Sequence, residues 1–111
     1  MGPGNYSIRK PVQSETVDMS VDPITQAAWY QAVDAMEFGG VAIEIFNPSG
    51  SPLIISTGDV GEEDDNILPY TIPPGGTSGP YMFELKAGRP LSFKALDADV
   101  NNGRLIVNLF G

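Results

Sequence analysis

The amino-acid sequence predicts an all-β protein whose body is an antiparallel β-sandwich or a jelly-roll-like barrel. The first observation is that 13 glycines and 10 prolines divide the chain into short segments. The second is that these segments are rich in β-branched and aromatic residues, which favour strands. The third is that turn residues recur between them, as they do in sandwiches and barrels. A parallel sheet would need several crossover helices, and the pattern does not supply them.

The chain is long enough for one domain and too short for two. It has 111 residues, 41% of them hydrophobic, which is an ordinary content for a folded protein. We expect an extended N-terminal arm at residues 1–22 and a single β-sandwich domain at 23–111.

The arm is expected because the apolar residues of 1–22 stand singly among Gly, Pro, Ser, Gln, Asp and Glu. Such a segment cannot bury its apolar side chains alone, so it lies in a groove of its own body or of a neighbour, or it stays loose. The alternation of Val17, Met19 and Val21 predicts an edge strand within this segment.

Residues 23–38 can be interpreted in two ways. Asp22 can cap a helix that has Pro23 at its first position, and Gly39 and Gly40 would end it, so the capping signals favour one short helix. The alternative is a strand from Trp29 to Val33, followed by a turn.

The strands expected in the body follow from short apolar runs bounded by turn residues. Their ranges are 41–46, 53–57, 67–72, 81–85, 91–96 and 104–110. The turn sequence at 47–52 predicts that the first two strands form a hairpin. Turn signals at 73–76, 86–90 and 101–103 predict antiparallel pairing for the others.

The composition argues against several classes of function. Fourteen acidic and six basic residues give a net charge of -8, so neither nucleic acid nor an anionic membrane is an expected partner. No apolar run approaches the roughly 18 to 20 residues that cross a bilayer. The N-terminus lacks the basic and apolar regions of a secretion signal, so we expect synthesis and retention in the cytoplasm.

An enzyme is not expected, because the chain contains no histidine and no cysteine. These are the usual proton shuttle, metal ligands and activated nucleophile. Acidic residues such as Glu37, Glu44 and Glu84 could form an acid–base pair, but nothing in the sequence selects one. We therefore assign no catalytic residue, no cofactor and no metal.

Three loops contain motifs that could be taken for binding sites. Residues 59–66 hold five carboxylates, which suits a solvated acidic loop better than a calcium site, although calcium stays open. In residues 97–103, Asn102 stands where a calcium-binding loop needs its glycine, and Asn108 stands where that loop needs its glutamate. The segment therefore predicts a polar hairpin loop whose Asp and Asn side chains bond their own backbone. Residues 73–80 lack the lysine and the helix of a phosphate loop.

The chain resembles small virion proteins of tailed bacteriophages. The resemblance is carried by the segments 41–53, 88–96 and 103–111, and it covers roughly the last 70 residues in strand spacing and loop composition. In size and layout it is most similar to the decoration proteins, also called cement or staple proteins, of short-tailed phages of the epsilon-fifteen type. The resemblance implies a structural protein on the outer capsid surface that braces neighbouring major capsid subunits, often in pairs or threes.

We therefore expect the partner to be the major capsid protein, with a homo-oligomer, a dimer or a trimer, on the shell. The capsid interface is inferred to lie in the arm, because an extended segment can add a strand to an exposed sheet edge. Two of the six basic residues of the chain also lie there. The interface residues are Tyr6, Ile8, Arg9, Lys10 and Val12.

A second hypothesis is a carbohydrate- or receptor-binding module of a phage tail or fibre. It requires Trp29, Tyr70 or Tyr81 to be exposed beside polar loop groups, whereas a cement protein can bury these rings or turn them to another protein.

The arm hypothesis predicts that a chain lacking residues 1–20 still folds but attaches more weakly to the capsid. Sedimentation of the shortened protein with undecorated heads measures this, and full occupancy would remove the arm from the mechanism.

Overall fold

The computed structural model of the protein describes residues 13–36, 40–47, 51–74, 76–84 and 86–109. For residues 40–47, 70 and 76–84 it describes the backbone and not the side chains. The strands are β1 (Gln13–Asp18), β2 (Tyr30–Val33), β3 (Gly40–Asn47), β4 (Leu53–Ser56), β5 (Ile67–Ile72), β6 (Gly76–Glu84), β7 (Leu91–Ala95) and β8 (Arg104–Leu109). The 3-10 helix Glu63–Asp65 lies between β4 and β5. The all-β prediction is therefore confirmed.

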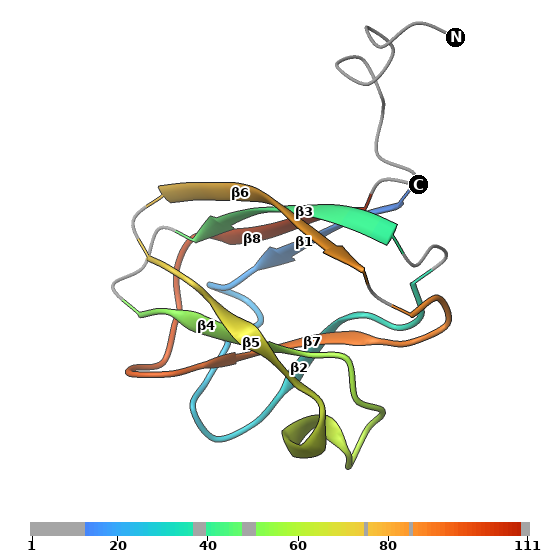
Figure 1. Ribbon diagram of the computed structural model, residues 1–111. Helices are drawn as coiled ribbons and strands as arrows, with labels where there is room; N and C mark the ends of the chain where they lie inside the picture. Colours follow the sequence, from blue (N-terminus) through green and yellow to red (C-terminus); the bar gives the residue numbers. More distant parts are fainter. Residues whose placement is uncertain (1–12, 37–39, 48–50, 75, 85, 110–111) are drawn as a thin grey trace, which may run out of the picture.

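The strands lie in two layers that face each other (Figure 1). One layer is a four-stranded sheet in the order β2-β7-β4-β5, and the other contains the ladders β1-β8 and β3-β6, with β3 beside β8. Every ladder is antiparallel. The turn signals at 73–76, 86–90 and 101–103 predict this orientation, but these turns do not join paired strands, because β5 pairs with β4, β6 with β3, and β8 with β1. This arrangement is sandwich-like. A jelly roll would need β3 and β8 to be joined by hydrogen bonds into one sheet, and that finer description stays a prediction.

The hydrophobic core lies between the two layers, because alternate side chains of each strand point inward. On β7, Leu91, Phe93 and Ala95 are buried. The other buried hydrophobic residues among those described are Val17, Met19, Ile24, Val33, Met36, Leu53, Ile55, Ile72, Val100, Leu105, Val107 and Leu109.

The helix favoured for 23–38 is wrong over its described part, residues 23–36. Tyr30–Val33 is a strand that pairs with β7, as in the alternative interpretation. Ile24 is buried. Its N–H donates to the carbonyl of Val100 at 3.0 Å, and the N–H of Val100 donates to the carbonyl of Ile24 at 2.8 Å. Pairing with distant segments therefore outweighs the local capping signals of Asp22 and Pro23.

The hairpin expected from 41–46 and 53–57 is also wrong. β3 pairs with β6, and β4 pairs with β5 and β7 in the other layer. The connection between β3 and β4 therefore crosses from one layer to the other. Strands are also present where 67–72, 81–85, 91–96 and 104–110 were predicted, although β6 begins at Gly76, five residues before its predicted start. Residues 85 and 110 lie outside the described residues.

The division expected at residue 22 does not separate an arm from a body. Gln13–Asp18 forms β1 and pairs with β8 over six residue pairs, and Val17 and Met19 lie in the core. A strand is therefore present in this segment, but it covers 13–18 and belongs to the folded domain. Of the three residues whose alternation predicted it, Val17 lies in the strand, whereas Met19 and Val21 lie in the turn that follows. A chain lacking residues 1–20 loses that strand, so the shortened protein proposed from the sequence would not keep its body intact.

Two titratable groups near β1 have shifted pKa values. The hydroxyl and then the N–H of Ser20 donate to the Asp18 carboxylate at 2.6 and 3.0 Å, and with Arg104 nearby they lower the pKa of Asp18. Burial raises the pKa of Tyr30, and the charges of Asp22 and Glu15 act in the same direction. The electrostatic influence of Glu15 on Tyr30 reflects the contact between β1 and β2 across the two layers.

Substitution of Met19 by alanine tests whether the segment before residue 22 belongs to the body. Met19 is 0% exposed, so its truncation is expected to cost about 2 to 5 kcal/mol of unfolding free energy. Val21 is 71% exposed and serves as the control, because Val21→Ala should change stability by less than about 0.5 kcal/mol. Denaturant unfolding of both variants measures the difference. If the two variants were equally stable, the segment before residue 22 would be an arm and not part of the core.

Candidate functional site

The interface residues inferred from the sequence, Tyr6, Ile8, Arg9, Lys10 and Val12, lie outside the described residues. The structure does describe where that segment joins the body. Gln13 is the first residue of β1, opposite Leu109 of β8, and its side-chain Nε2 donates to the carbonyl of Ala35 at 3.3 Å. Residues 1–12 therefore join the domain at the start of β1.

Among the described strands, β1 has one ladder partner, β8, and so lies at an edge of its layer. Ser14, Glu15 and Thr16 are exposed on it. A strand at an edge presents backbone groups that a further strand can pair with. The backbone of β1 thus offers an edge directly next to the segment in which the sequence places the capsid interface.

The loop that connects β4 to β5 is held by several side-chain hydrogen bonds. It begins at Ser56, which is fully buried on the opposite face of β4 from Leu53 and Ile55. The Ser56 hydroxyl donates to the carbonyl of Glu63 at 2.7 Å and accepts the N–H of Gly58 at 3.0 Å. The hydroxyl therefore fastens the 3-10 helix over the outer face of the sheet.

Gly58 is required by the same close approach. A Cβ atom at this position would lie 2.4 Å from the carbonyl oxygen of Glu62, which is backbone and cannot swing aside. The loop closes on itself at a point where no other residue fits without a shift of the chain.

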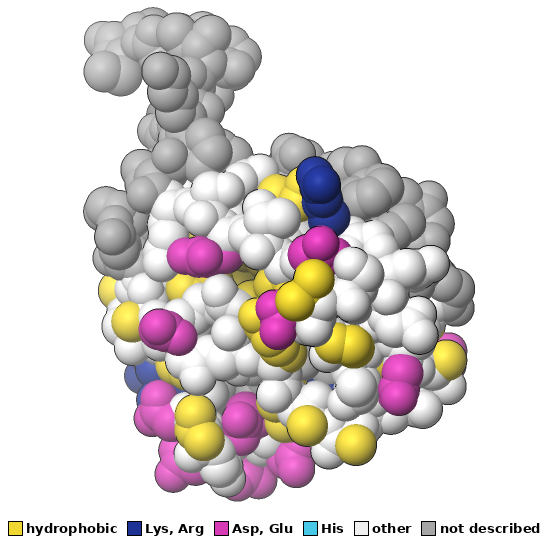
Figure 2. Space-filling model, turned by 180° about the vertical axis from the view of Figure 1, so that it is seen from behind, with side chains coloured by type: hydrophobic (Ala, Val, Ile, Leu, Met, Phe, Trp, Pro, Cys, Tyr) yellow, Lys and Arg dark blue, Asp and Glu magenta, His cyan; other side chains and the backbone are white. Residues whose placement is uncertain are grey.

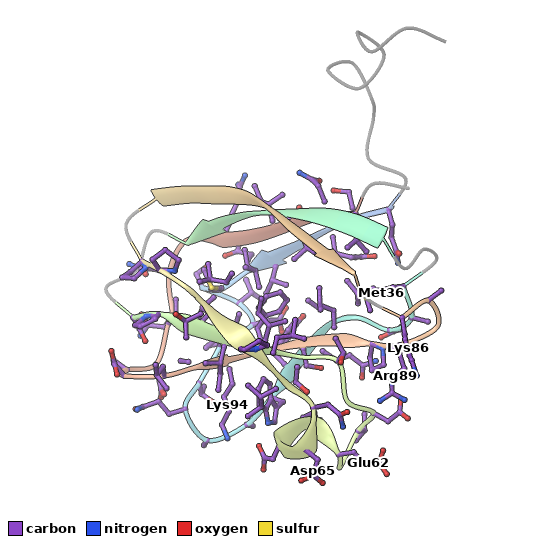
Figure 3. All side chains as sticks on the ribbon, viewed as in Figure 1. Met36, Glu62, Asp65, Lys86, Arg89 and Lys94 are labelled. Atoms are coloured by element: carbon purple, nitrogen blue, oxygen red, sulfur yellow. The ribbon has the colours of Figure 1, made fainter. Side chains whose placement is uncertain are left out.

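Arg89 ties the loop to the turn before β7. Its Nε donates to the carbonyl of Thr57 at 3.1 Å, and its guanidinium forms a 3.1 Å ion pair with Asp59. Figure 3 shows Arg89 beside Lys86 and near Met36 at the end of the body where these loops meet. Because Asp59 is 59% exposed, the ion pair contributes little by itself, and the bond to the Thr57 backbone positions the side chain.

Trp29 forms the third attachment of the loop. Its indole Nε1 donates to Asp64 Oδ1 at 2.9 Å, and Lys94 Nζ lies 5.5 Å from the ring centroid. Trp29 is half-buried, and Lys94 projects from β7 on the outer face of the sheet. An aromatic ring, a cation and a carboxylate thus meet at one place on the surface. The sequence did not show this cluster, because Trp29 and Asp64 are 35 positions apart.

Acidic side chains gather at this end of the protein. Figure 2 shows Asp and Glu side chains concentrated at the lower left, where the β4–β5 loop lies when Figure 1 is viewed from behind. Glu62 and Asp65 point away from the body in Figure 3. Within the described residues, no group of three or more His, Cys, Asp or Glu side chains is placed to hold a metal ion. The calcium interpretation of 59–66 therefore gains no support from the geometry.

The loop at 97–103 is polar, as expected, but its bonds differ from those predicted. Asp99 accepts the backbone N–H of Gln26 at 2.8 Å, so it binds a distant segment and not its own loop. The N–H groups of Asp97 and Ala98 donate to the buried Ser51 hydroxyl at 3.2 Å. Gln26 on one side and Ser51 on the other thus hold the loop in place.

Several other sequence candidates cannot be placed. Glu37 and the side chains of Glu44, Glu84, Tyr70 and Tyr81 lie outside what the structure describes. No helix in the described part of the chain is long and apolar enough to span a membrane.

Comparison of the chain with protein-family models, with curated proteins and with solved structures gave no match. Arguments about function therefore rest on this chain's own residues.

Replacement of Asp64 by alanine is expected to free the 3-10 helix from Trp29. Trp29 is the single tryptophan of the chain, so its fluorescence reports on this contact alone. We expect D64A to shift the emission to longer wavelength, because the indole N–H loses its partner and gains water. D65A is the control, since Asp65 is exposed beside it. The same emission shift in both variants would contradict the assigned hydrogen bond.

Proposed function

We propose that this protein decorates the outer surface of a bacteriophage capsid, where it binds the major capsid protein and reinforces contacts between subunits. It acts by binding and carries out no catalytic step. The finer jelly-roll description of the body belongs to the same proposal, as does a dimer or trimer on the shell. The protein is made in the host cytoplasm and functions in the virion.

The observation that carries the proposal is the place where the chain joins the body. Residues 1–12 lead into β1, which has one ladder partner among the described strands and so lies at an edge. Twelve residues span at most about 40 Å when extended, enough to reach a neighbouring subunit.

The distribution of charge supports this assignment. Residues 1–12 contain Arg9 and Lys10 and no acidic residue, whereas all 14 acidic residues follow. The segment is thus opposite in charge to the rest of the chain, and its two cations are attracted to carboxylates. Basic and apolar residues together suit a capsid surface that offers carboxylates and a free strand edge.

Because the capsid repeats the same binding site, weak individual contacts are sufficient to hold the protein on it. A capsid presents the same junction many times, and an oligomer that binds several junctions at once dissociates far more slowly than a single copy. Each bound copy adds contacts that must break before two capsid subunits separate. This is the mechanical sense in which a binding protein strengthens a shell.

Removal of residues 1–12 tests the proposal without removing β1. We expect the shortened protein to keep the unfolding midpoint of the full chain and to lose at least about tenfold in affinity for undecorated heads, measured by co-sedimentation. R9A/K10A should weaken binding in the same direction, with a reduced dependence on salt.

K86A/R104A is the matched control, because it also removes two cations but takes them from exposed positions on the body. It should bind like the full chain. If the full chain itself fails to bind heads, the proposed function is wrong; if the shortened chain binds as well as the full chain, the arm is excluded as the interface.

The alternative, a carbohydrate- or receptor-binding module, is favoured by one observation. Trp29 is partly exposed and lies beside the carboxylate of Asp64 and the cation of Lys94, an arrangement that can stack on a sugar ring and bond its hydroxyls. Titration with soluble host glycans would then change the Trp29 emission, and W29F would abolish binding. A constant emission across the titration would leave the capsid proposal as the better one.

A further inference from the structure

The turn that leads into β8 contains two neighbouring residues whose own groups can react with each other. Asn102 and Gly103 lie in this turn, at the left of Figure 1, and Asn102 is exposed. Asn102 is the one asparagine of the chain that a glycine follows. The side-chain amide carbon of an asparagine lies within reach of the next backbone nitrogen, and glycine has no side chain that blocks the approach.

Within the described part of the chain, neither reacting group is engaged in a hydrogen bond. This holds for the side-chain amide of Asn102 and for the N–H of Gly103. The carbonyl of Gly103, in contrast, accepts the N–H of Met19 at 2.9 Å. The φ of Gly103 is 81°, in the left-handed region that favours glycine. The amide and the nitrogen that attacks it are therefore both available, beside a carbonyl that is held in place.

The other asparagines whose side chains the structure describes differ from Asn102. The Nδ2 of Asn66 donates to a backbone carbonyl at 2.9 Å, and a β-branched residue follows it. Asn108 lies within β8, where its Oδ1 accepts the hydroxyl of Ser14 at 2.7 Å. Asn101 is exposed, but the residue after it carries a side chain. Sequence and geometry together therefore select Asn102.

We propose that Asn102 is a modification site at which the folded protein converts its own asparagine to aspartate and isoaspartate, with water as the only co-reactant. The backbone nitrogen of Gly103 gives its proton to hydroxide and attacks Cγ of Asn102. The new C–N bond closes a succinimide ring and the Cγ–Nδ2 bond breaks. The side-chain nitrogen takes a proton from water and leaves as ammonia, which regenerates the hydroxide.

A water molecule then opens the ring at either of its carbonyl carbons, and the ring nitrogen regains its proton. Cleavage between Cγ and the Gly103 nitrogen leaves aspartate in an ordinary backbone. Cleavage between the main-chain carbonyl carbon of residue 102 and the same nitrogen leaves isoaspartate, in which the chain runs through Cβ and Cγ and is longer by one carbon. Either product adds a carboxylate, so the net charge of -8 becomes more negative by one unit.

The longer backbone of the isoaspartate form lies where β8 begins. Arg104 pairs with Asp18 at this end of the β1–β8 ladder, and the next residue, Met19, is bonded to Gly103. A slip of β8 cannot absorb the extra carbon, because Leu105 and every second residue after it are buried. The strain therefore falls on the hydrogen bond between Met19 and Gly103, which we expect to open.

The site itself is independent of the capsid proposal, but one consequence rests on that proposed function. A virion makes no new protein, so modified copies accumulate with the age of the particle. The arm joins the body at the pair Gln13 and Leu109, at the other end of the β1–β8 ladder from Asn102. Attachment through the arm is therefore expected to persist in the modified protein.

Incubation of the purified full-length protein at mildly alkaline pH tests the site. Peptide mass spectrometry should show that Asn102 loses its amide, at a rate proportional to the hydroxide concentration, while Asn66 and Asn108 stay intact. The same incubation in denaturant is the reference, because it removes the hydrogen bonds of the fold. We expect denaturant to accelerate the loss at Asn66 and Asn108 more than at Asn102. If folding protects Asn102 as strongly as the other two, the proposal is wrong.

Two variants identify the reacting residue. Asn102→Gln should keep its amide, because attack on a glutamine has to close a larger ring, and it should fold with an unchanged melting temperature because the side chain is exposed. Asn101→Gln is the matched control, since it removes the neighbouring exposed asparagine and should leave the rate unaltered. Release of ammonia from N102Q at the rate of the unaltered protein would overturn the assignment.

Hydrogen exchange at the amide of Met19 tests the structural consequence. In the isoaspartate form, separated by chromatography, this N–H should exchange about fivefold faster, the factor that corresponds to the loss of one hydrogen bond. Asn102→Asp is the control, because it adds the charge without the extra carbon and should leave the exchange rate unchanged. Equal exchange in all three proteins would overturn the expected opening. None of these measurements uses phage heads, so their failure is distinguishable from failure of the proposed function.

Discussion

The alternation of side chains along β7 is the constraint on which the rest of the structure depends. β7 lies between β2 and β4, and each neighbour is held by an antiparallel ladder. Leu91, Phe93 and Ala95 therefore point into the core, while Ser92 and Lys94 must point outward. The same strand thus fills the interior and places Lys94 over Trp29 on the surface. A slip by one residue would exchange the two sets and destroy both the core and the surface cluster.

How far the sequence predicted this fold depends on whether a signal was local. The runs at 67–72, 91–96 and 104–110 were predictable, because apolar residues and turn residues alternate within a few positions. The segment after Asp22 was not, since its capping residues favour a helix while Ile24 pairs with Val100 far along the chain. The partner of β3 was not predictable either, because a turn signal at 47–52 shows that the chain bends but not into which layer it continues.

The contacts of the candidate site could not be predicted from local sequence signals either. Acidic residues at 59–66 and the single tryptophan were each visible in the sequence, but their contact through Asp64 joins segments 35 positions apart. The inferred interface residues Tyr6, Ile8, Arg9, Lys10 and Val12 lie outside the described residues, so their role stays a prediction. What the structure adds is the point at which that segment joins an edge strand. Two of the six basic residues, Arg9 and Lys10, precede every acidic residue of the chain, and the other four lie between residues 86 and 104.

The buried hydroxyl of Ser56 has a consequence for how this protein can change during evolution. A position on the outer face of a sheet usually accepts many side chains, but here the loop above leaves space for a small residue that can both donate and accept. Any larger residue would lift the loop, and the missing side chain of Gly58 would then no longer be required. In divergent descendants of this chain, positions 56 and 58 should therefore be replaced together, along with the length of the loop, and seldom one at a time.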